Sequence, residues 1–198
     1  MWVVMLGILV VVGLGLVFVY NRIVSQRNRV DEAWAQISVQ LKRRHDLIPN
    51  LVATVKGYAG HEQQTLEDVI SARSAAVGAQ RGASGGPTAA EMQAEGQLSM
   101  ALGRLLAISE SYPDLKATEN FQQLQAELVA TEDRIAFSRQ YYNDVTRQWN
   151  TTIASIPYNL IAGPMAATRR PYFELNEMTG GPGAAPGGGA TQPPDVTF

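Results

Sequence analysis

The sequence predicts an all-α protein, in which an N-terminal transmembrane helix continues into an antiparallel, up-and-down bundle of three to four long, coiled-coil-like helices. Two observations carry this prediction. Residues 1–21 contain no charged side chain, and apolar residues then recur at intervals of three and four along most of the chain. The chain therefore divides into an anchor (1–21), a helical body (22–176) and a Gly- and Pro-rich tail (177–198) whose composition predicts disorder.

The apolar run from Trp2 to Val19 is long enough to cross a bilayer. About 20 residues at about 1.5 Å each span the roughly 30 Å hydrocarbon core. Trp2 and Tyr20 stand at the two ends of the run, where amphipathic rings favour the membrane interface. A cleaved signal peptide is the alternative, but no basic residue precedes the run and no small-x-small pair follows it. We therefore expect a retained single-pass anchor.

Arginines on one side of the anchor predict its orientation. Arg22, Arg27 and Arg29 all follow the apolar run closely, and only the terminal amine lies before it. Because basic residues near a span stay in the cytoplasm, we expect the body to be cytoplasmic. The absence of cysteine leaves the compartment open.

The first body helix is expected to be continuous with the anchor and to end near Gly60, since Gly and Pro are absent from Tyr20 to Ile48. His45 lies on its apolar stripe, which favours a buried histidine with a hydrogen-bond partner. Pro49 removes the bond to the His45 carbonyl, so we expect a kink there. We expect Asn50, with the polar groups of 141–143, to satisfy the freed backbone groups.

Three further helices are expected at about 62–77, 89–111 and 119–155. Two arrangements remain open: two long rods with a broken rod between them, or a true four-helix bundle with two short members. The apolar but interrupted segment from Tyr158 to Phe173 is interpreted either as a strap along the bundle or as a segment that contacts a partner or a membrane.

The densest basic cluster is Lys42, Arg43 and Arg44, followed by Asp46. It lies about 30 Å beyond Tyr20 along a straight helix, whereas the membrane potential decays within about 10 Å, so binding to its own bilayer is disfavoured. One interpretation is a partner surface. The other is intramolecular pairing with acidic residues, namely Asp46, Asp68, Glu127, Glu132 or Asp133.

Several long motifs resemble the LemA family. They are V-D-E-A-W-A-Q-I-S-V-Q-L-K-R-R-H-D-L-I-P-N-L-V at 30–52, V-K-G-Y-A-G-H-E, Y-P-D-L-K, E-N-F-Q-Q-L-Q-A-E-L, I-A-F-S-R-Q-Y-Y-N-D and I-P-Y-N-L-I-A-G. The resemblance covers most of the chain from the span to about residue 175. It implies a bacterial protein of the cytoplasmic (inner) membrane with an N-terminal span and a helical bundle, and no enzymatic activity is generally attached to the family.

Residue types that carry catalysis are sparse. Cysteine is absent, and neither His45 nor His61 has a Glu three positions before it, as a di-metal bundle site would require. We expect no catalytic residue, no metal and no cofactor. A net charge of −2 gives no reason to propose nucleic acid as a partner.

The leading hypothesis is thus a non-enzymatic, membrane-anchored scaffold or adaptor for other membrane or envelope proteins. Gly7, Gly13 and Gly15 make self-association through the span plausible. One alternative is a membrane-surface sensor that acts through the Tyr158–Phe173 segment. A weaker one is an enzyme that uses Asp46, Arg73 and Tyr142.

Overall fold

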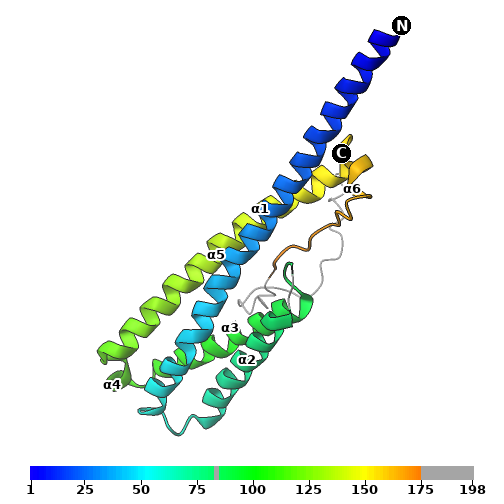
Figure 1. The fold of residues 1–198 in the computed structure, drawn as a ribbon. Helices are drawn as coiled ribbons and strands as arrows, with labels where there is room; N and C mark the ends of the chain where they lie inside the picture. Colours follow the sequence, from blue (N-terminus) through cyan, green and yellow to red (C-terminus); the bar gives the residue numbers. More distant parts are fainter. Residues whose placement is uncertain (83–84, 175–198) are drawn as a thin grey trace, which may run out of the picture.

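The computed structural model describes residues 1–82 and 85–174, and these ranges contain helices and no β-strand. The helices are α1 (Trp2–Lys56), α2 (Gln63–Gly82), α3 (Ala89–Ser109), α4 (Pro113–Lys116), α5 (Glu119–Ala154) and α6 (Tyr158–Ala162) (Figure 1). The predicted all-α fold, with an apolar helix leading into a helical body, is confirmed. The predicted disorder of 177–198 lies outside the described residues.

Helix α1 combines the anchor and the first bundle helix in 55 uninterrupted residues. Its side chains are exposed from the N-terminus to Phe18, and the first buried one is Val19. It is the one helix in the described part of the chain that is long and apolar enough to cross a membrane. Beyond Val19 the buried residues follow a stripe at intervals of three and four, which faces the rest of the bundle.

The bundle consists of two helix pairs. Helix α5 packs along α1, α3 packs along α2, and α2 also contacts α1. In Figure 1 the chain runs down α1, up α2, down α3 and up α5, so that the end of α5 returns to the level at which α1 leaves the body. The two shorter helices lie side by side rather than end to end, which favours the four-helix arrangement over two rods with a broken third.

Several helix boundaries differ from the expected ones. Helix α1 ends at Lys56 rather than near Gly60, and α2 continues through Gly78 to Gly82. A Cβ at Gly78 would meet nothing within 4 Å, so this glycine interrupts no packing, and one glycine costs a helix only about 1 kcal/mol. Helix α3 begins after Thr88, whose hydroxyl accepts from the Glu91 backbone N–H at 3.1 Å.

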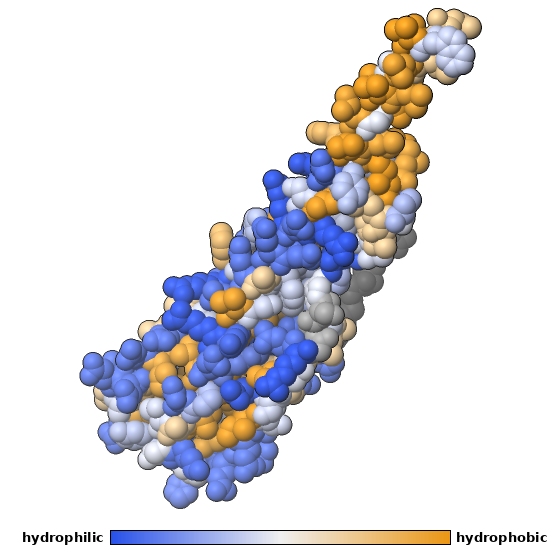
Figure 2. Space-filling view, in the orientation of Figure 1, coloured by the Kyte–Doolittle hydropathy of each residue, from blue (hydrophilic) through white to orange (hydrophobic). Residues whose placement is uncertain are grey.

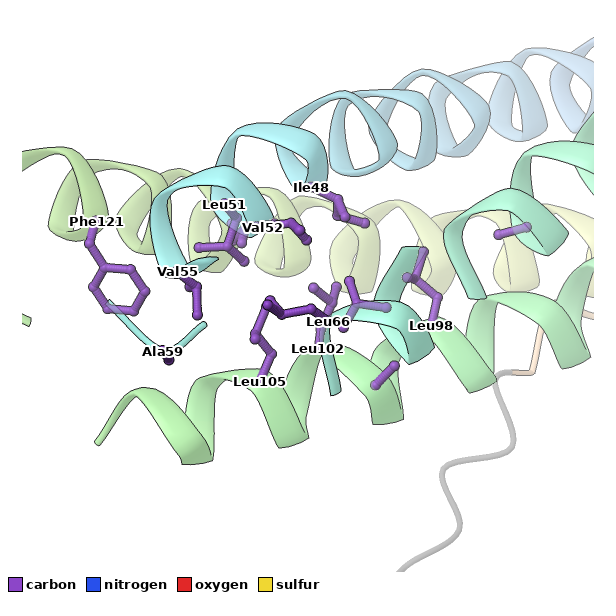
Figure 3. Packing of buried hydrophobic residues seen from close by; sticks show 14 of the residues in the cluster. Ile48, Leu51, Val52, Val55, Ala59, Leu66, Leu98, Leu102, Leu105 and Phe121 are labelled. Carbon is purple, nitrogen blue, oxygen red and sulfur yellow. The ribbon is translucent and has the colours of Figure 1, made fainter. Parts of the chain in front are cut away.

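Two hydrophobic clusters fill the bundle. The distal cluster, shown in part in Figure 3, lies at the end of the body remote from the anchor. Its fully buried members include Ile48, Leu51, Leu98, Leu105 and Phe121. The proximal cluster extends from Val19 to Leu41 on α1 and includes residues of α5, α6 and the segment after α6. Its largest fully buried side chains include Ile23, Ile37, Tyr142, Trp149 and Phe173.

Residues 163–174, called the strap here, run back along α5 toward the N-terminus of α3 (Figure 1). The Tyr142 hydroxyl donates to the Pro171 carbonyl at 2.9 Å, and the Asn143 side chain exchanges two hydrogen bonds with the Phe173 backbone at 2.8 and 3.1 Å. Phe173 is fully buried and packs edge-on against Trp34. The strap interpretation is therefore correct for this part of the 158–173 segment.

Candidate functional site

A layer of polar side chains separates the two hydrophobic clusters. On α1 the proximal cluster ends at Leu41 and the distal cluster begins at Ile48, and the layer occupies the turn between them. It consists of Arg44 and His45 from α1, Glu91, Glu95 and Ser99 from α3, and Glu132 from α5. Burying a charged group in a bundle core costs free energy unless the group is paired, so the partners of each of these side chains decide whether the layer is stable.

Arg44 is the centre of this layer. Its guanidinium is only 1% exposed and pairs with Glu95, while Nη1 donates to Glu132 at 2.9 Å and to Ser99 at 3.1 Å. The Glu132 carboxylate is half exposed, so it links the buried charge to solvent. One arginine thereby joins α1 to both α3 and α5.

His45 occupies the next position and bonds the same glutamate. Its Nε2 lies 2.9 Å from Oε1 of Glu95, and both side chains are buried. Burial alone would raise the pKa of Glu95, but the His45 hydrogen bond and the charge of Arg44 outweigh it and lower that pKa below its usual value. The prediction of a buried, hydrogen-bonded His45 is confirmed.

Glu91 lies one helical turn before Glu95 and is fully buried, but neither of its carboxyl oxygens has a hydrogen-bond partner. Burial, together with the nearby charge of Glu95, raises its pKa to about 7, against a weaker lowering by the bond at Thr88. Thr88 and Glu91 have the spacing of a capping box, but only the hydroxyl-to-backbone half of that motif is formed. Glu91 is thus a buried carboxyl group that favours its protonated form.

Both glutamates could have been found from the apolar stripe of α3. Counting back from Leu105 through Leu102 and Leu98 in steps of three and four leads to Glu95 and then Glu91. A carboxylate on an apolar stripe, opposite a histidine on another apolar stripe, is a signal for a buried pair.

An arginine of α2 replaces the backbone hydrogen bond that Pro49 removes from α1. The proline cannot donate to the His45 carbonyl, and Arg73 Nε donates to that oxygen at 2.7 Å. Asn50, expected to help there, is exposed, and its carbonyl accepts from the Thr54 hydroxyl at 2.9 Å. Tyr142 and Asn143, expected there as well, bind the strap. That part of the interpretation is therefore wrong, whereas the kink itself stays a prediction.

The basic cluster is divided between core and surface. Lys42, Arg43 and Asp46 are exposed, whereas Arg44 is buried and so cannot belong to a partner surface. Arg43 lies 3.8 Å from Glu127, and Arg44 pairs with Glu132, as the intramolecular interpretation predicts. Glu95, the most buried partner, was missing from that interpretation.

The membrane-end residues are all accessible. Trp2 is 83% and Tyr20 is 51% exposed, at opposite ends of the apolar run. Arg22, Arg27 and Arg29 are exposed on the part of α1 that follows the run.

The weaker enzyme hypothesis finds its residues occupied elsewhere. Arg73 donates to the His45 carbonyl and Tyr142 to the Pro171 carbonyl, while Asp46 is exposed on α1. Within residues 1–82 and 85–174, no group of three His, Cys, Asp or Glu side chains is placed to hold a metal ion. What the polar layer can do is hold a buried charge network and exchange a proton at Glu91.

The fold and site define a class: a helical bundle fused to an exposed apolar helix, with a buried ion-pair layer at mid-length. A family model described as LemA matches residues 33–183, and the chain belongs to the LemA family. It is 24% identical over 165 residues to "Protein LemA" of Metamycoplasma hominis, with 81% of this chain and 73% of that protein covered.

The chain is also similar to magnetosome proteins. It is 27% identical over 174 residues to "Magnetosome protein MamQ" of Magnetospirillum gryphiswaldense and 26% identical over 175 residues to "Magnetosome protein MamQ 2" of Paramagnetospirillum magneticum. These matches cover 78% of this chain but 64% of the length of each relative.

Proposed function

We propose that this protein is a non-enzymatic, membrane-anchored scaffold, in which α1 crosses the bacterial inner membrane and holds the helical body in the cytoplasm. The observation that carries the proposal is the fusion of the two parts in one helix. The same 55-residue α1 has an exposed apolar run at its start and a buried bundle stripe after it. Because no loop separates the two, the body is held rigidly relative to the anchor.

The outer face of α5 is the best surface for a protein partner. Val129 is 54% and Phe137 is 75% exposed, and Ala126, Ala130 and Ala136 lie between or beside them on the same helical face. We call these five residues the α5 face. Exposed apolar side chains with polar neighbours such as Asp133 and Gln140 suit a partner that binds and dissociates.

Self-association through the span is a related possibility. Gly7, Gly13 and Gly15 have open space where a Cβ would lie, so a second helix could approach the backbone closely there.

The first test combines topology with cross-linking on one membrane preparation. A C-terminal tag should resist protease in intact spheroplasts and be digested in inverted vesicles. Digestion in spheroplasts would place the body outside and overturn the orientation that we base on Arg22, Arg27 and Arg29.

The scaffold itself is tested with a photo-crosslinking residue at Phe137. The matched control is Ile70, which is 50% exposed on α2, away from the α5 face. We expect discrete cross-linked products at position 137 and few at position 70. If neither position yields a protein partner or an oligomer in membranes, the scaffold proposal fails.

A further inference from the structure

The turn from α5 into α6 is uncharged over a long stretch. From Gln148 to Thr168 the chain contains no Asp, Glu, Lys, Arg or His, and it is bounded by Arg147 and Arg169. We call residues 148–168 the tip. No comparable uncharged stretch occurs elsewhere in the helical body between Arg22 and Arg147, where charged residues are spread along each helix. Such a composition is unusual at the end of a bundle that faces water.

Part of the tip presents large apolar side chains outward. Ile156 is 80% and Leu160 is 72% exposed, whereas Ile153 and Ala162 on either side are buried in the proximal cluster. Leu160 lies on α6, which packs against both α1 and α5, and Ile156 lies in the short turn between α5 and α6. Both side chains are therefore carried by a part of the chain that adjoins the bundle.

The tip lies at the level where the apolar run of α1 ends. Val19 and Ile23 are the first buried residues of α1, and they belong to the proximal cluster together with Ala162 of α6. Tyr158 and Ile161 of α6 also pack against this cluster. Val19 is the last apolar residue before Tyr20, and Arg22 follows within one turn. Figure 1 shows α6 beside α1 at this point, and in Figure 2 the orange surface of the anchor extends down to the same level.

From this juxtaposition we propose that the tip, through Ile156 and Leu160, is embedded in the lipid bilayer that α1 crosses and forms a second membrane contact of the protein. The inference rests on the proposed span, since it is α1 that sets the depth of the tip. Lipid is the occupant that fits, because the exposed apolar surface of α6 adjoins the exposed apolar surface of the anchor. Arg22 closely follows the apolar run in the sequence and Arg169 directly follows the tip; both are exposed and suited to lipid phosphates.

The contact needs little further ordering. Because α6 is packed on α1, insertion of the anchor brings the tip to the interface without a separate association step. The strap reinforces this position: the Trp149 indole N–H donates to the Thr168 carbonyl, and Asn150 exchanges two hydrogen bonds with the Arg170 backbone, all at 2.9 Å. The tip is thus a preformed surface rather than a segment that must fold on the membrane.

The absence of cysteine makes a direct test possible. Single-cysteine variants of the full chain, Ile156→Cys and Leu160→Cys, are spin-labelled and reconstituted in phosphatidylcholine–phosphatidylglycerol vesicles. Accessibility of the label to oxygen, which enriches in lipid, is compared with its accessibility to a water-soluble nickel chelate. Phe137→Cys is the control for an exposed apolar position on α5 far from the anchor, and Leu9→Cys is the control for the span.

We expect the oxygen-to-nickel accessibility ratio at positions 156 and 160 to exceed that at 137 several-fold and to approach that at position 9. A ratio at 156 and 160 equal to that at 137 overturns the inference while position 9 still reports lipid. Labels shielded from both reagents indicate a protein neighbour and overturn it too. If position 9 is itself accessible to nickel, the proposed span has failed, and the two failures are thereby distinguished.

Discussion

Replacing Glu91 with glutamine should remove a pH dependence from the stability of the bundle. The parent carboxyl group is fully buried, has no hydrogen-bond partner, and has a pKa of about 7 rather than 4.5. Because the folded pKa is the higher one, folding favours the protonated form. The corresponding stability is fully present below pH 4.5 and is lost as the pH rises through about 7.

The size of the effect follows from the same displacement. A pKa moved from 4.5 to about 7 corresponds to about 3 kcal/mol between the two protonation states. Glutamine has nearly the shape of the protonated glutamate and carries no charge. The Glu91→Gln variant should therefore match the parent in acid and exceed its free energy of unfolding by up to about 3 kcal/mol at about pH 8.

Urea unfolding of the full chain in detergent, followed by circular dichroism across a pH series, measures this difference. The matched control is Glu67→Gln, which makes the same substitution at an exposed position of α2. Glu95 acts in the opposite direction, since its lowered pKa gives stability that is lost as the pH falls, but it is common to both chains being compared. A Glu91→Gln variant that is destabilised equally at every pH would refute the reasoning, because it would show a hydrogen-bonding role for the carboxylate.

Three further changes test the polar layer, the hydrogen bond of Arg73 to α1 and the strap. Arg44→Leu should lower the free energy of unfolding by about 3–5 kcal/mol, because it leaves Glu95 buried without its cation. The double variant Arg44→Leu, Glu95→Leu should lose less than the single variant. Denaturant titration measures both differences. Arg73→Met should lower the free energy of unfolding by about 1–3 kcal/mol, because it leaves the His45 carbonyl unpaired. Adding Pro49→Ala restores a backbone N–H donor to that carbonyl and should recover part of the loss, as a double-mutant cycle would measure. Phe173→Ala should cost about 3–5 kcal/mol and make the strap more susceptible to limited trypsin digestion.

Each of these changes has an outcome that would contradict it. Additive losses for Arg44 and Glu95 would mean that the pair is not coupled. If the effects of Arg73→Met and Pro49→Ala on the free energy of unfolding were additive, Arg73 would stabilise α1 in another way than through the His45 carbonyl. For the strap, Tyr172→Ala is the control, since Tyr172 is 40% exposed beside Phe173 and should change little.

The fold could be predicted because apolar periodicity reports burial directly. The stripe of α1 continues across Pro49, so the sequence predicts a helix on both sides of it, and the structure has one helix throughout. The partner of the His45 carbonyl could not be predicted in the same way. The identity of that partner depends on which residue of α2 faces the turn. This is set by the register of α2 against α1, which the sequence of the connecting loop does not determine.

The polar layer was harder to predict for a related reason. Charged residues usually lie on solvent-facing stripes, so the positions of Glu91 and Glu95 on the apolar stripe of α3 indicate burial but do not show which residues pair with them. Only the assembled bundle brings Arg44 and His45 of α1 into contact with Glu95 of α3, one helical turn from Glu91. The exposure of Ile156 and Leu160 likewise becomes meaningful only when α6 is placed beside Val19, which depends on the return of α5 along α1.

The register of α5 against α1 links the layer to the tip. Both helices carry apolar residues at repeating intervals, so a slip by one heptad, about 10 Å along the axis, would still pair apolar with apolar over most of their length. It would not preserve the layer, because the half-exposed Glu132 would leave the buried Arg44. The slip would leave the buried Arg44 guanidinium with one carboxylate fewer, so the Arg44–Glu132 pair favours the observed register. The same 10 Å would move α6 away from Val19, so the Arg44–Glu132 pair also supports the position of α6 on which the proposed bilayer contact of Ile156 and Leu160 depends.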